Sequence, residues 1–493
     1  MNFQNSMKPI YYSAFLACLS LFLAGCAANV PYRTSLPDPP AGIHRPTGSG
    51  LATIDPITNA VIETHTLLVG TNQTSFKIGY VEFDDQGWFW GHQQWQAVKQ
   101  AIGEEETNSR PNGLEIVVFV HGWKNNANYT NGDVVMFRQV LADLSANLYP
   151  SKVKVFGVYL GWRGWSILSD YFPIPLGQEL TFYHRKAVAE RIGHEGAATE
   201  VFTELQIMQQ RFNDYNNSNG VQRTGLVIVG HSFGGQLVFS AISQILTERV
   251  LLAQDNQPFP SFGDLVVLVN PAFEASLYNN LIALATAKDI HYPAHQPPVL
   301  AVFTSRGDTA TRNWFPRGRF FPALIESFRP GRGTNEEWLF NIPKNDPPNQ
   351  SDAFRETIGH DEDYINYDLN YTNFNSHAAT RPHFSLSERQ QIFQTIRAQQ
   401  ETLAFNNTNR NITNYKPYYF TNSINGTNYA CILQPRTNDI SVPFINAEVD
   451  THIIRNHDDI NNPIFLQFLQ AFILFTQTNY SEVQTFGSGL SAR

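Results

Sequence analysis

A serine that could act as a nucleophile stands at position 232, inside the run Gly-His-Ser-Phe-Gly-Gly. The apolar run 226–229 before it predicts a buried strand, and the stretch 236–246 after it predicts a helix. A tight turn between strand and helix forces the serine into strained backbone geometry and leaves no room for side chains at Gly230 and Gly234. We therefore expect the Ser232 hydroxyl to project from the edge of a sheet, where it can attack a carbonyl carbon.

The elements that would position this serine alternate between strands and helices. The predicted strands are continuous apolar runs, which indicates burial on both faces and a parallel, doubly wound sheet. These runs lie at 77–83, 115–120, 153–160, 226–229, 265–269, 299–303 and 443–449. Helices are predicted at 94–102, at 134–148 with Asp133 as the N-cap, at 186–212, at 236–246 and at 463–476.

Composition divides the chain into five parts. We expect a signal peptide at 1–25, a tether and N-terminal extension at 26–72, the core at 73–310, an insertion at 311–440, and the last strand and helix at 441–493. The insertion is rich in Asn, Pro and aromatic residues, and a structureless loop of that length is improbable. A cap packed over the sheet edge and a surface excursion with no catalytic role both remain open for it.

The serine turn and the alternating elements resemble the α/β-hydrolase superfamily, in particular its esterase- and lipase-like lipoprotein members. The resemblance covers roughly 75–310 and 440–480. It implies an α/β fold with a doubly wound, mostly parallel sheet, here with a large insertion before the last core strand. It also implies a catalytic triad in the chain order Ser, Asp, His, and it adds no cofactor.

The triad requires a histidine, because a serine hydroxyl is a poor nucleophile until a general base removes its proton. His457 is our choice, since it lies between the predicted last strand and last helix, where members of the superfamily carry their base. The competing histidines lie in the insertion: His360, His377 and His383. His231 is expected to point away from the site, because neighbouring side chains diverge at the turn.

The base needs a carboxylate that fixes its tautomer and stabilises the imidazolium. Asp308 follows the predicted strand 299–303, at the edge where the superfamily holds its acid. A solvated turn aspartate is the alternative for this residue. Asp264 precedes its strand and would therefore lie at the opposite edge of the sheet.

An oxyanion hole is predicted where His121, Gly122 and Trp123 end the strand 115–120. By the resemblance, the backbone N–H groups of Trp123 and Phe233 would stabilise the tetrahedral intermediate, each donor contributing about 3–4 kcal/mol. His121 would hold this loop rather than act as the base. Trp123, Trp162 and Trp165 suggest an apolar pocket for an acyl group, although core packing explains them equally well.

Neither a metal nor a cofactor is predicted. The fourteen histidines include no His-x-x-x-His pair flanking a glutamate, and no phosphate-binding glycine loop is followed by a lysine. The acidic run Gly-His-Asp-Glu-Asp at 359–363 lacks the spacing of a ligand set, so we expect it to form a solvated loop.

The N-terminus predicts export. An apolar stretch at 11–23, too short for a comfortable membrane span, ends in Leu-Ala-Gly-Cys26, which resembles a bacterial lipoprotein signal. In such proteins the cysteine is lipidated and becomes the first residue, and Ala27 after it favours the outer membrane. An ordinary secretory signal or a short anchor is the alternative. Cys18 would leave with the signal, so Cys431 would remain alone and no internal disulfide is expected.

Charge and composition narrow the function further. The net charge is −9 without any basic block, which argues against a nucleic-acid partner. The expected function is a serine hydrolase of the bacterial envelope that cleaves small-molecule or lipid carboxylic esters through an acyl-enzyme. A peptidase or thioesterase of the same fold, or an inert surface binding lipoprotein, are the alternatives. The sequence carries no signal for an oligomeric state.

Overall fold

The computed structural model describes most of the predicted core. Its described residues are 29–36, 40–44, 59–165, 175–194, 196–220, 222–252, 259–287, 290, 292, 296–319, 326–327, 350–373, 418–424, 427–436 and 442–488. The predicted signal peptide, Cys26, His377 and His383 lie outside these residues. Within the described part, none of the helices combines the length and the apolar character that a membrane crossing would require.

The described strands form one 12-stranded sheet in the order β1-β2-β3-β5-β4-β6-β7-β8-β12-β9-β11-β10. Neighbours from β3 to β9 along this order are parallel, whereas the β2–β3, β9–β11 and β10–β11 pairs are antiparallel. The mostly parallel sheet predicted from the sequence is therefore confirmed. The strands are β1 (Pro40–His44), β2 (Ile62–Val69), β3 (Asn72–Phe83), β4 (Leu114–Val120), β5 (Lys154–Trp162), β6 (Thr224–His231), β7 (Leu265–Val269), β8 (Leu300–Ser305), β9 (Tyr367–Asn373), β10 (Tyr418–Ile424), β11 (Thr427–Pro435) and β12 (Phe444–Val449).

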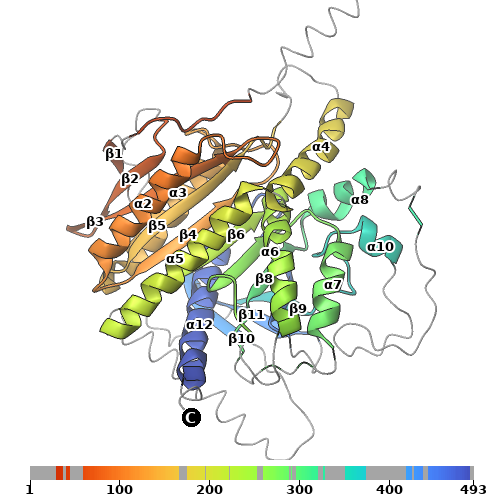
Figure 1. Cartoon of the computed structure of the whole chain (residues 1–493). Coiled ribbons are helices and arrows are strands. Elements are labelled where there is room, and N and C mark those ends of the chain that lie inside the picture. The colour runs from red at the N-terminus through yellow and green to blue at the C-terminus, as the bar shows by residue number, and fades with distance from the viewer. Residues whose placement is uncertain are drawn as a thin grey trace, which may run out of the picture.

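Helices cover both faces of the sheet (Figure 1). One face packs against α2 (His92–Ser109), α4 (Pro175–His194), α5 (Ala197–Asn219), α6 (Phe233–Leu252) and α7 (Ala275–Ala285). The other face packs against α3 (Gly132–Leu148) and α12 (Pro463–Ser488). The short helices are η1 (Tyr149–Ser151), η3 (Ala310–Trp314), α8 (Phe315–Gly318) and α10 (Gln350–Arg355).

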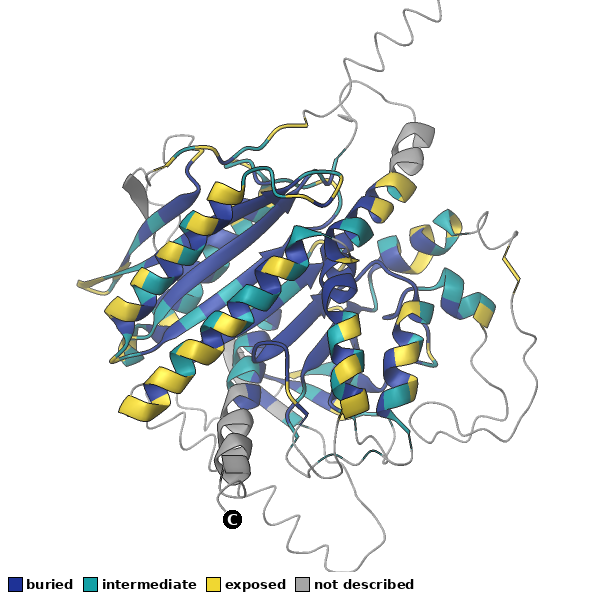
Figure 2. Ribbon diagram, viewed as in Figure 1, coloured by how far each residue is buried: buried dark blue, intermediate teal, exposed yellow. Residues whose placement is uncertain are grey.

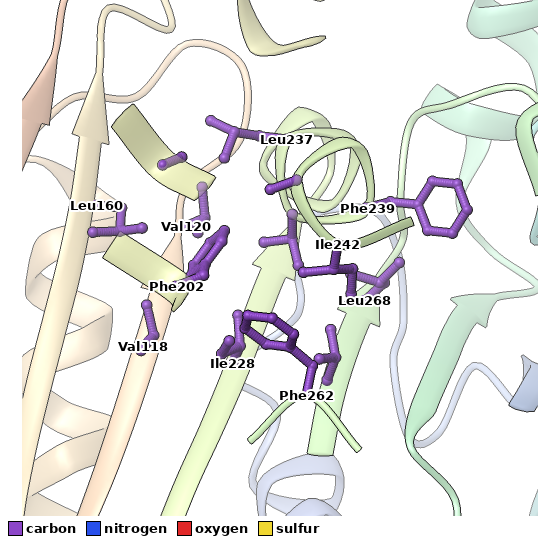
Figure 3. Close-up of a cluster of buried hydrophobic side chains, with 14 of the residues drawn as sticks. Val118, Val120, Leu160, Phe202, Ile228, Leu237, Phe239, Ile242, Phe262 and Leu268 are labelled. Atoms are coloured by element: carbon purple, nitrogen blue, oxygen red, sulfur yellow. The ribbon is translucent and has the colours of Figure 1, made fainter. Parts of the chain in front are cut away.

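The core lies on both sides of the central strands, which Figure 2 shows as buried along most of their length. In β4, Val118 and Val120 belong to the cluster beneath α5 and α6, whereas Phe119 belongs to the cluster beneath α3. Figure 3 shows the first cluster, where Phe202 of α5 and Leu237 of α6 lie near the strand residues. Burial on both faces explains why these strands are continuous apolar runs.

Two helix boundaries differ from the prediction. The single helix expected at 186–212 is two helices, α4 and α5, with a break after His194. Just before this break a Cβ on Gly193 would lie 2.3 Å from the Leu237 carbonyl oxygen, so only glycine permits α4 to approach α6 so closely. The cap of α3 is Asn131 rather than Asp133, because the Asn131 side chain accepts a hydrogen bond from the Asp133 N–H.

The described parts of 311–440 extend the core rather than only covering it. The strands β9, β11 and β10 continue the sheet beyond β12. The run at 359–363 is a loop, as predicted, but it is solvated only in part: Glu362 is exposed, whereas Asp361 is 5% exposed and a Cβ on Gly359 would lie 1.8 Å from the Thr304 hydroxyl. Because this run packs against β8, it lies next to the residues that follow that strand.

The N-terminal segment at 29–36 is also part of the domain, whereas the sequence suggested a loose tether. Arg33 is fully buried, donates to the Ala127 carbonyl at 2.7 Å and pairs with Glu63 at 2.6 Å. The backbone N–H groups of Tyr32 and Arg33 donate to the Glu82 carboxylate. A prediction from composition missed this segment because its contacts lie far away in the sequence.

Candidate active site

Ser232 stands at the crest of the turn between β6 and α6, with a φ of 56°. This left-handed conformation costs a non-glycine residue about 1–3 kcal/mol, so the surrounding structure must impose it. A Cβ on Gly230 would lie 2.8 Å from the Gly234 carbonyl oxygen, and a Cβ on Gly234 would lie 2.1 Å from that of Val120. Glycine is therefore required at both positions, for the reason that the sequence suggested.

The structure brings Ser232, His457 and Asp308 together in a single chain of hydrogen bonds. The Nε2 atom of His457 lies 2.9 Å from the Ser232 hydroxyl, and its Nδ1 atom lies 2.8 Å from an Asp308 carboxylate oxygen. His457 comes from the loop between β12 and α12, and Asp308 comes from the loop after β8. In this arrangement Nδ1–H donates to the carboxylate and Nε2 can accept the serine proton.

Two neighbouring side chains fix the loop that carries His457. Asn270, which follows β7 and is fully buried with a φ of 45°, donates to the His457 carbonyl at 2.9 Å. The His231 ring donates to the same carbonyl at 2.9 Å. His231 is thus a hydrogen-bonding residue that positions the backbone of His457, but its ring lies beside the site, 5.0 Å from the ring of His457, rather than pointing away from it. Sequence reasoning missed Asn270, whose only signal is a polar residue at the end of a buried strand.

Asp308 is fully buried and has more donors than the histidine alone. It accepts hydrogen bonds from the N–H groups of Ala310 and Thr311, at 2.9 and 3.0 Å, and from the Thr311 hydroxyl. Burial acts to raise the pKa of Asp308, but His457 and Thr311 outweigh it and lower this pKa to about 2. Asp308 is therefore an anion throughout the neutral range, and Asp264, at the start of β7, lies elsewhere and pairs with Arg223.

His360, the other described candidate for the base, lies behind Asp308 rather than in front of it. Its Nε2 atom is 2.9 Å from the Thr311 hydroxyl, which in turn donates to Asp308, and its Nδ1 atom accepts from Arg312 at 3.4 Å. Burial lowers the pKa of His360 to about 4, so the ring is neutral at pH 7. His360 also has a hydrogen bond with the Asp308 backbone, so it adjoins Asp308 directly, whereas His457 lies between Asp308 and Ser232.

The pKa of His457 is shifted in the opposite direction to that of His360. Burial acts to lower its pKa, but the hydrogen bond and the charge of Asp308, with Asp458 and Asp133 adding to them, raise the pKa above its ordinary value. The imidazolium that forms after proton abstraction is thus favoured at the position where the reaction would need it.

The predicted oxyanion loop lies against the serine. A Cβ on Gly122 would be 2.8 Å from the Ser232 Cβ. His121 is fully buried, contacts the Gly122 carbonyl through Nδ1 at 2.9 Å and accepts from the Trp162 N–H at 3.0 Å. Burial lowers its pKa to about 4. His121 is therefore placed to hold the loop, as the sequence suggested, and it does not contact the serine as a base would.

Further contacts fix the same loop. The Asp133 carboxylate accepts a hydrogen bond from the Gly122 N–H, and burial raises the pKa of Asp133 to about 6. Lys124 has a φ of 68°, and its N–H donates to the Gly164 carbonyl at 2.9 Å. The N–H of Phe233 belongs to the first turn of α6, where N–H groups have no acceptor within the helix.

Aromatic side chains gather beside this loop. The Phe182 ring lies 5.9 Å from Trp123, 5.2 Å from Phe233 and 5.6 Å from Phe315. Trp162 instead stacks on His121 and is 3% exposed, so core packing explains it. An acyl group at Ser232 would therefore find apolar surface from α4, α6 and α8 rather than from Trp162.

Two other features do not compete with this site. An apolar cavity of about 300 Å³ lies between α3, α12 and the sheet, and its lining includes none of Ser232, His457 and Asp308. His231, His457 and Asp458 are close enough together to hold a metal ion. Both ring nitrogens of His457 are already within hydrogen-bond distance of Ser232 and Asp308, so this group does not fit a metal centre.

Comparison with known proteins agrees with the fold. Residues 97–313 match the model of a family described as an alpha/beta hydrolase of unknown function (DUF900). No curated protein and no solved structure matches the chain significantly. The matched residues include Ser232 and Asp308, whereas His457 lies beyond them. Residues 97–313 are thus similar to an α/β-hydrolase family, in agreement with the mostly parallel sheet and the serine turn of the chain.

Proposed function

We propose that this protein is a serine hydrolase that cleaves carboxylic esters through an acyl-enzyme intermediate. The observation that carries the proposal is the hydrogen-bonded chain from Ser232 through His457 to Asp308, with the serine in a strained turn at the start of a helix. A site that had lost its chemistry would have no need to retain this strain.

In the first half of the reaction the Ser232 oxygen attacks the ester carbonyl carbon while His457 Nε2 takes the serine proton. The carbonyl oxygen becomes an oxyanion, which the N–H groups of Trp123 and Phe233 are placed to stabilise. The imidazolium then gives its proton to the leaving alcohol as the carbon–oxygen bond breaks. Asp308 stays ionised and keeps the ring in the required tautomer.

In the second half a water molecule attacks the acyl-enzyme, and His457 takes one of its protons. The bond to Ser232 breaks, the serine regains a proton from the imidazolium, and the carboxylic acid leaves. The same groups thus serve both steps, and no external oxidant, reductant or cofactor takes part.

A fluorophosphonate probe tests the proposal directly. We expect it to label Ser232 in the wild type and not in Ser232→Ala, with the modified peptide identified by mass spectrometry. Ser232→Ala should also lose hydrolysis of p-nitrophenyl esters while its melting temperature stays near that of the wild type. A folded wild-type protein that is never labelled would favour an inert binding module instead.

The choice of esters over thioesters or peptides rests on the superfamily resemblance and on the aromatic cluster around Phe182. Matched p-nitrophenyl esters, thioesters and peptides with the same acyl group would test this choice. We expect kcat/KM to be highest for the esters and to rise with acyl length, because each buried CH₂ contributes about 0.8 kcal/mol. A clear preference for the peptide would overturn this choice.

We also propose that Cys26 carries a lipid that anchors the protein to the bacterial envelope, with the outer membrane as the expected location. Support comes from the Leu-Ala-Gly-Cys sequence after the apolar leader. Mass spectrometry of the N-terminal peptide should find a diacylated Cys26 in the native protein, and Cys26→Ala should accumulate as an unlipidated precursor. An unmodified cysteine in the mature protein would contradict the proposal.

A further inference from the structure

We propose that the edge of the sheet that carries Ser232 faces a lipid bilayer, and that the protein draws its ester substrate from that membrane. The part of this inference that concerns the substrate rests on the proposed function. The part that concerns the surface rests on exposed residues and on the proposed lipid at Cys26, and it does not depend on catalysis.

The topology defines the surface. Parallel strands have their carboxyl ends at one edge, so the segments that follow β3, β4, β5, β6 and β8 all lie at the edge where Ser232 stands. Trp88 follows β3 and Trp314 follows β8. In the sheet order, β3 and β8 lie on opposite sides of β6. The two tryptophans therefore flank the serine.

Both side chains are unusually exposed for their type. Trp88 is 72% exposed and Trp314 is 56% exposed, and they are the most exposed tryptophans in the described part of the chain. Tyr183, beside Phe182 on α4, is a further aromatic residue at this edge and is 37% exposed. Single apolar residues on a surface are ordinary, but indole rings placed around one active site match the preference of tryptophan for the interface between membrane and water.

Cations accompany these rings. The Arg317 guanidinium lies 5.0 Å from the centre of the Trp314 ring, and the exposed Lys124 ammonium lies 4.6 Å from that of Trp123. The exposed carboxylate of Asp458 lies near Lys124, so this edge carries charges of both signs. Basic residues next to exposed aromatic rings are the combination that binds the headgroup region of a bilayer.

The N-terminal segment supplies an independent argument. Tyr32 and Arg33 are fixed to Glu82, which lies near the carboxyl end of β3, and Arg33 also contacts Ala127 in the segment after β4. The chain thus enters the domain at the Ser232 edge, and the exposed Val30, at 53%, lies just before this attachment.

The distance to the anchor is short. Cys26 precedes Tyr32 by six residues. At 3.3–3.6 Å per residue, a fully extended chain of that length reaches only about 20 Å. A lipid on Cys26 would therefore hold this edge, rather than the opposite one, against the membrane. For this reason the partner of this surface is a bilayer rather than a second protein.

The test uses the whole chain reconstituted into phosphatidylethanolamine–phosphatidylglycerol vesicles. The variant is Trp88→Ala/Trp314→Ala. The matched control is Leu251→Ala/Leu252→Ala, because these leucines are 64% and 71% exposed at the far end of α6, which begins at Ser232 and runs back along the sheet. Three quantities are measured: quenching of tryptophan fluorescence by brominated acyl chains, hydrolysis of a fluorogenic phospholipid ester in the vesicles, and hydrolysis of soluble p-nitrophenyl butyrate.

We expect brominated lipid to quench the wild type and the control, and quenching to fall sharply in the tryptophan variant. Phospholipid hydrolysis should fall at least tenfold in that variant only, while butyrate hydrolysis stays unchanged in all three proteins. If brominated lipid does not quench the fluorescence of the wild type, the proposal that this edge faces a bilayer is wrong. Measurable phospholipid hydrolysis that is equal in the variant and the control would also contradict the membrane-facing edge.

The same data separate this inference from the proposed function. If butyrate is hydrolysed but the tryptophan variant behaves like the control on vesicles, the membrane-facing edge is wrong and the hydrolase stands. If no ester is hydrolysed but quenching is lost in the tryptophan variant, the membrane-facing edge stands and the hydrolase is wrong.

Discussion

Two loops at the same edge of the sheet each bring a histidine towards Asp308, and their local sequences are alike. His457 is followed by Asp-Asp and His360 by Asp-Glu. His457 contacts both the Asp308 carboxylate and Ser232, whereas His360 contacts the Thr311 hydroxyl and the backbone of Asp308. The comparison teaches that three-dimensional distance to the serine, and not the neighbouring residues, separates a candidate base from a supporting residue.

The two rings also differ in charge. Asp308 raises the pKa of His457, whereas burial dominates at His360 and lowers its pKa to about 4. The loops are held differently as well: Asn270 and His231 bind the backbone of His457, while Gly359 places its loop directly against Thr304. One loop thus presents a ring that can gain a proton, and the other presents a ring that stays neutral.

The largest effect should come from removing each histidine ring in turn and comparing the two variants. His457→Ala should lower kcat for a soluble ester by about 10³–10⁴-fold, because Ser232 then keeps its proton. His360→Ala should lower it by no more than about tenfold, since the ring contacts only Thr311 and the backbone of Asp308 among these residues. Steady-state kinetics at matched folding, checked by circular dichroism, would measure this. An active His457→Ala beside a folded but inactive His360→Ala would reverse the comparison.

The next effect concerns the support of the His457 loop. Asn270→Ala removes a buried donor from the carbonyl groups of Asn456 and His457. We expect kcat to fall about 100-fold, the loss that a displacement of roughly 1 Å can cause, and labelling of Ser232 to slow in parallel. Thr357→Ala is the matched control, because it lies in the other loop, is also fully buried and should leave kcat within a few fold. Equal losses in both variants would indicate a general destabilisation instead.

A smaller effect is expected at Thr311, whose hydroxyl lies between Asp308 and His360. Thr311→Val keeps the shape of the side chain but removes the hydroxyl between Asp308 and His360. Loss of one hydrogen bond to a charged group, about 1.5 kcal/mol, should lower kcat roughly tenfold, and Thr311→Ser should restore it. If the serine variant is as slow as the valine variant, the hydroxyl has no positioning role.

The smallest effect is a displacement of the pH profile. His457 must be neutral to accept the serine proton, so kcat/KM should rise with pH through the pKa of this residue. Because Asp308 raises that pKa, the midpoint should lie above the ordinary histidine value of about 6.5. Asp308→Asn should move the midpoint down, whereas His360→Ala should leave it nearly unchanged. A profile that does not change in Asp308→Asn would mean that another group titrates.

The sequence was enough to predict the parts of the site that depend on local geometry. The strand, turn and helix around Ser232 follow from a short pattern, because glycines at 230 and 234 are required wherever a helix begins so abruptly after a strand. Asp308 could be placed from its position directly after a buried strand. The family match covers the same two residues and ends before His457.

The remaining parts depend on contacts between distant residues, which leave no periodic signal. Asn270 and Thr311 are single polar residues whose roles appear only when two loops meet. The run at 359–363 looks solvated by composition, yet Gly359 packs against Thr304 of β8 and Asp361 is buried, while Glu362 is exposed. The burial of Asp361 raises the pKa of this residue to about 7. Burial is unfavourable for a carboxyl group, so no composition rule would suggest it here.

The buried Arg33 has a consequence for how the protein can be shortened. Glu63 is 2% exposed and is paired with both Arg33 and Arg138, and Arg33 also lies 3.6 Å from the centre of the Tyr80 ring. Loss of Arg33 leaves Arg138 on Glu63 but removes one buried ion pair and the backbone donors of the Glu82 carboxylate, and a buried acceptor left unsatisfied costs about 1–3 kcal/mol. A recombinant form that starts after residue 36, an attractive choice for crystallisation, would lose this arginine. Trimming should therefore stop before Tyr32 and keep the whole docked segment, even when the lipid anchor itself is removed.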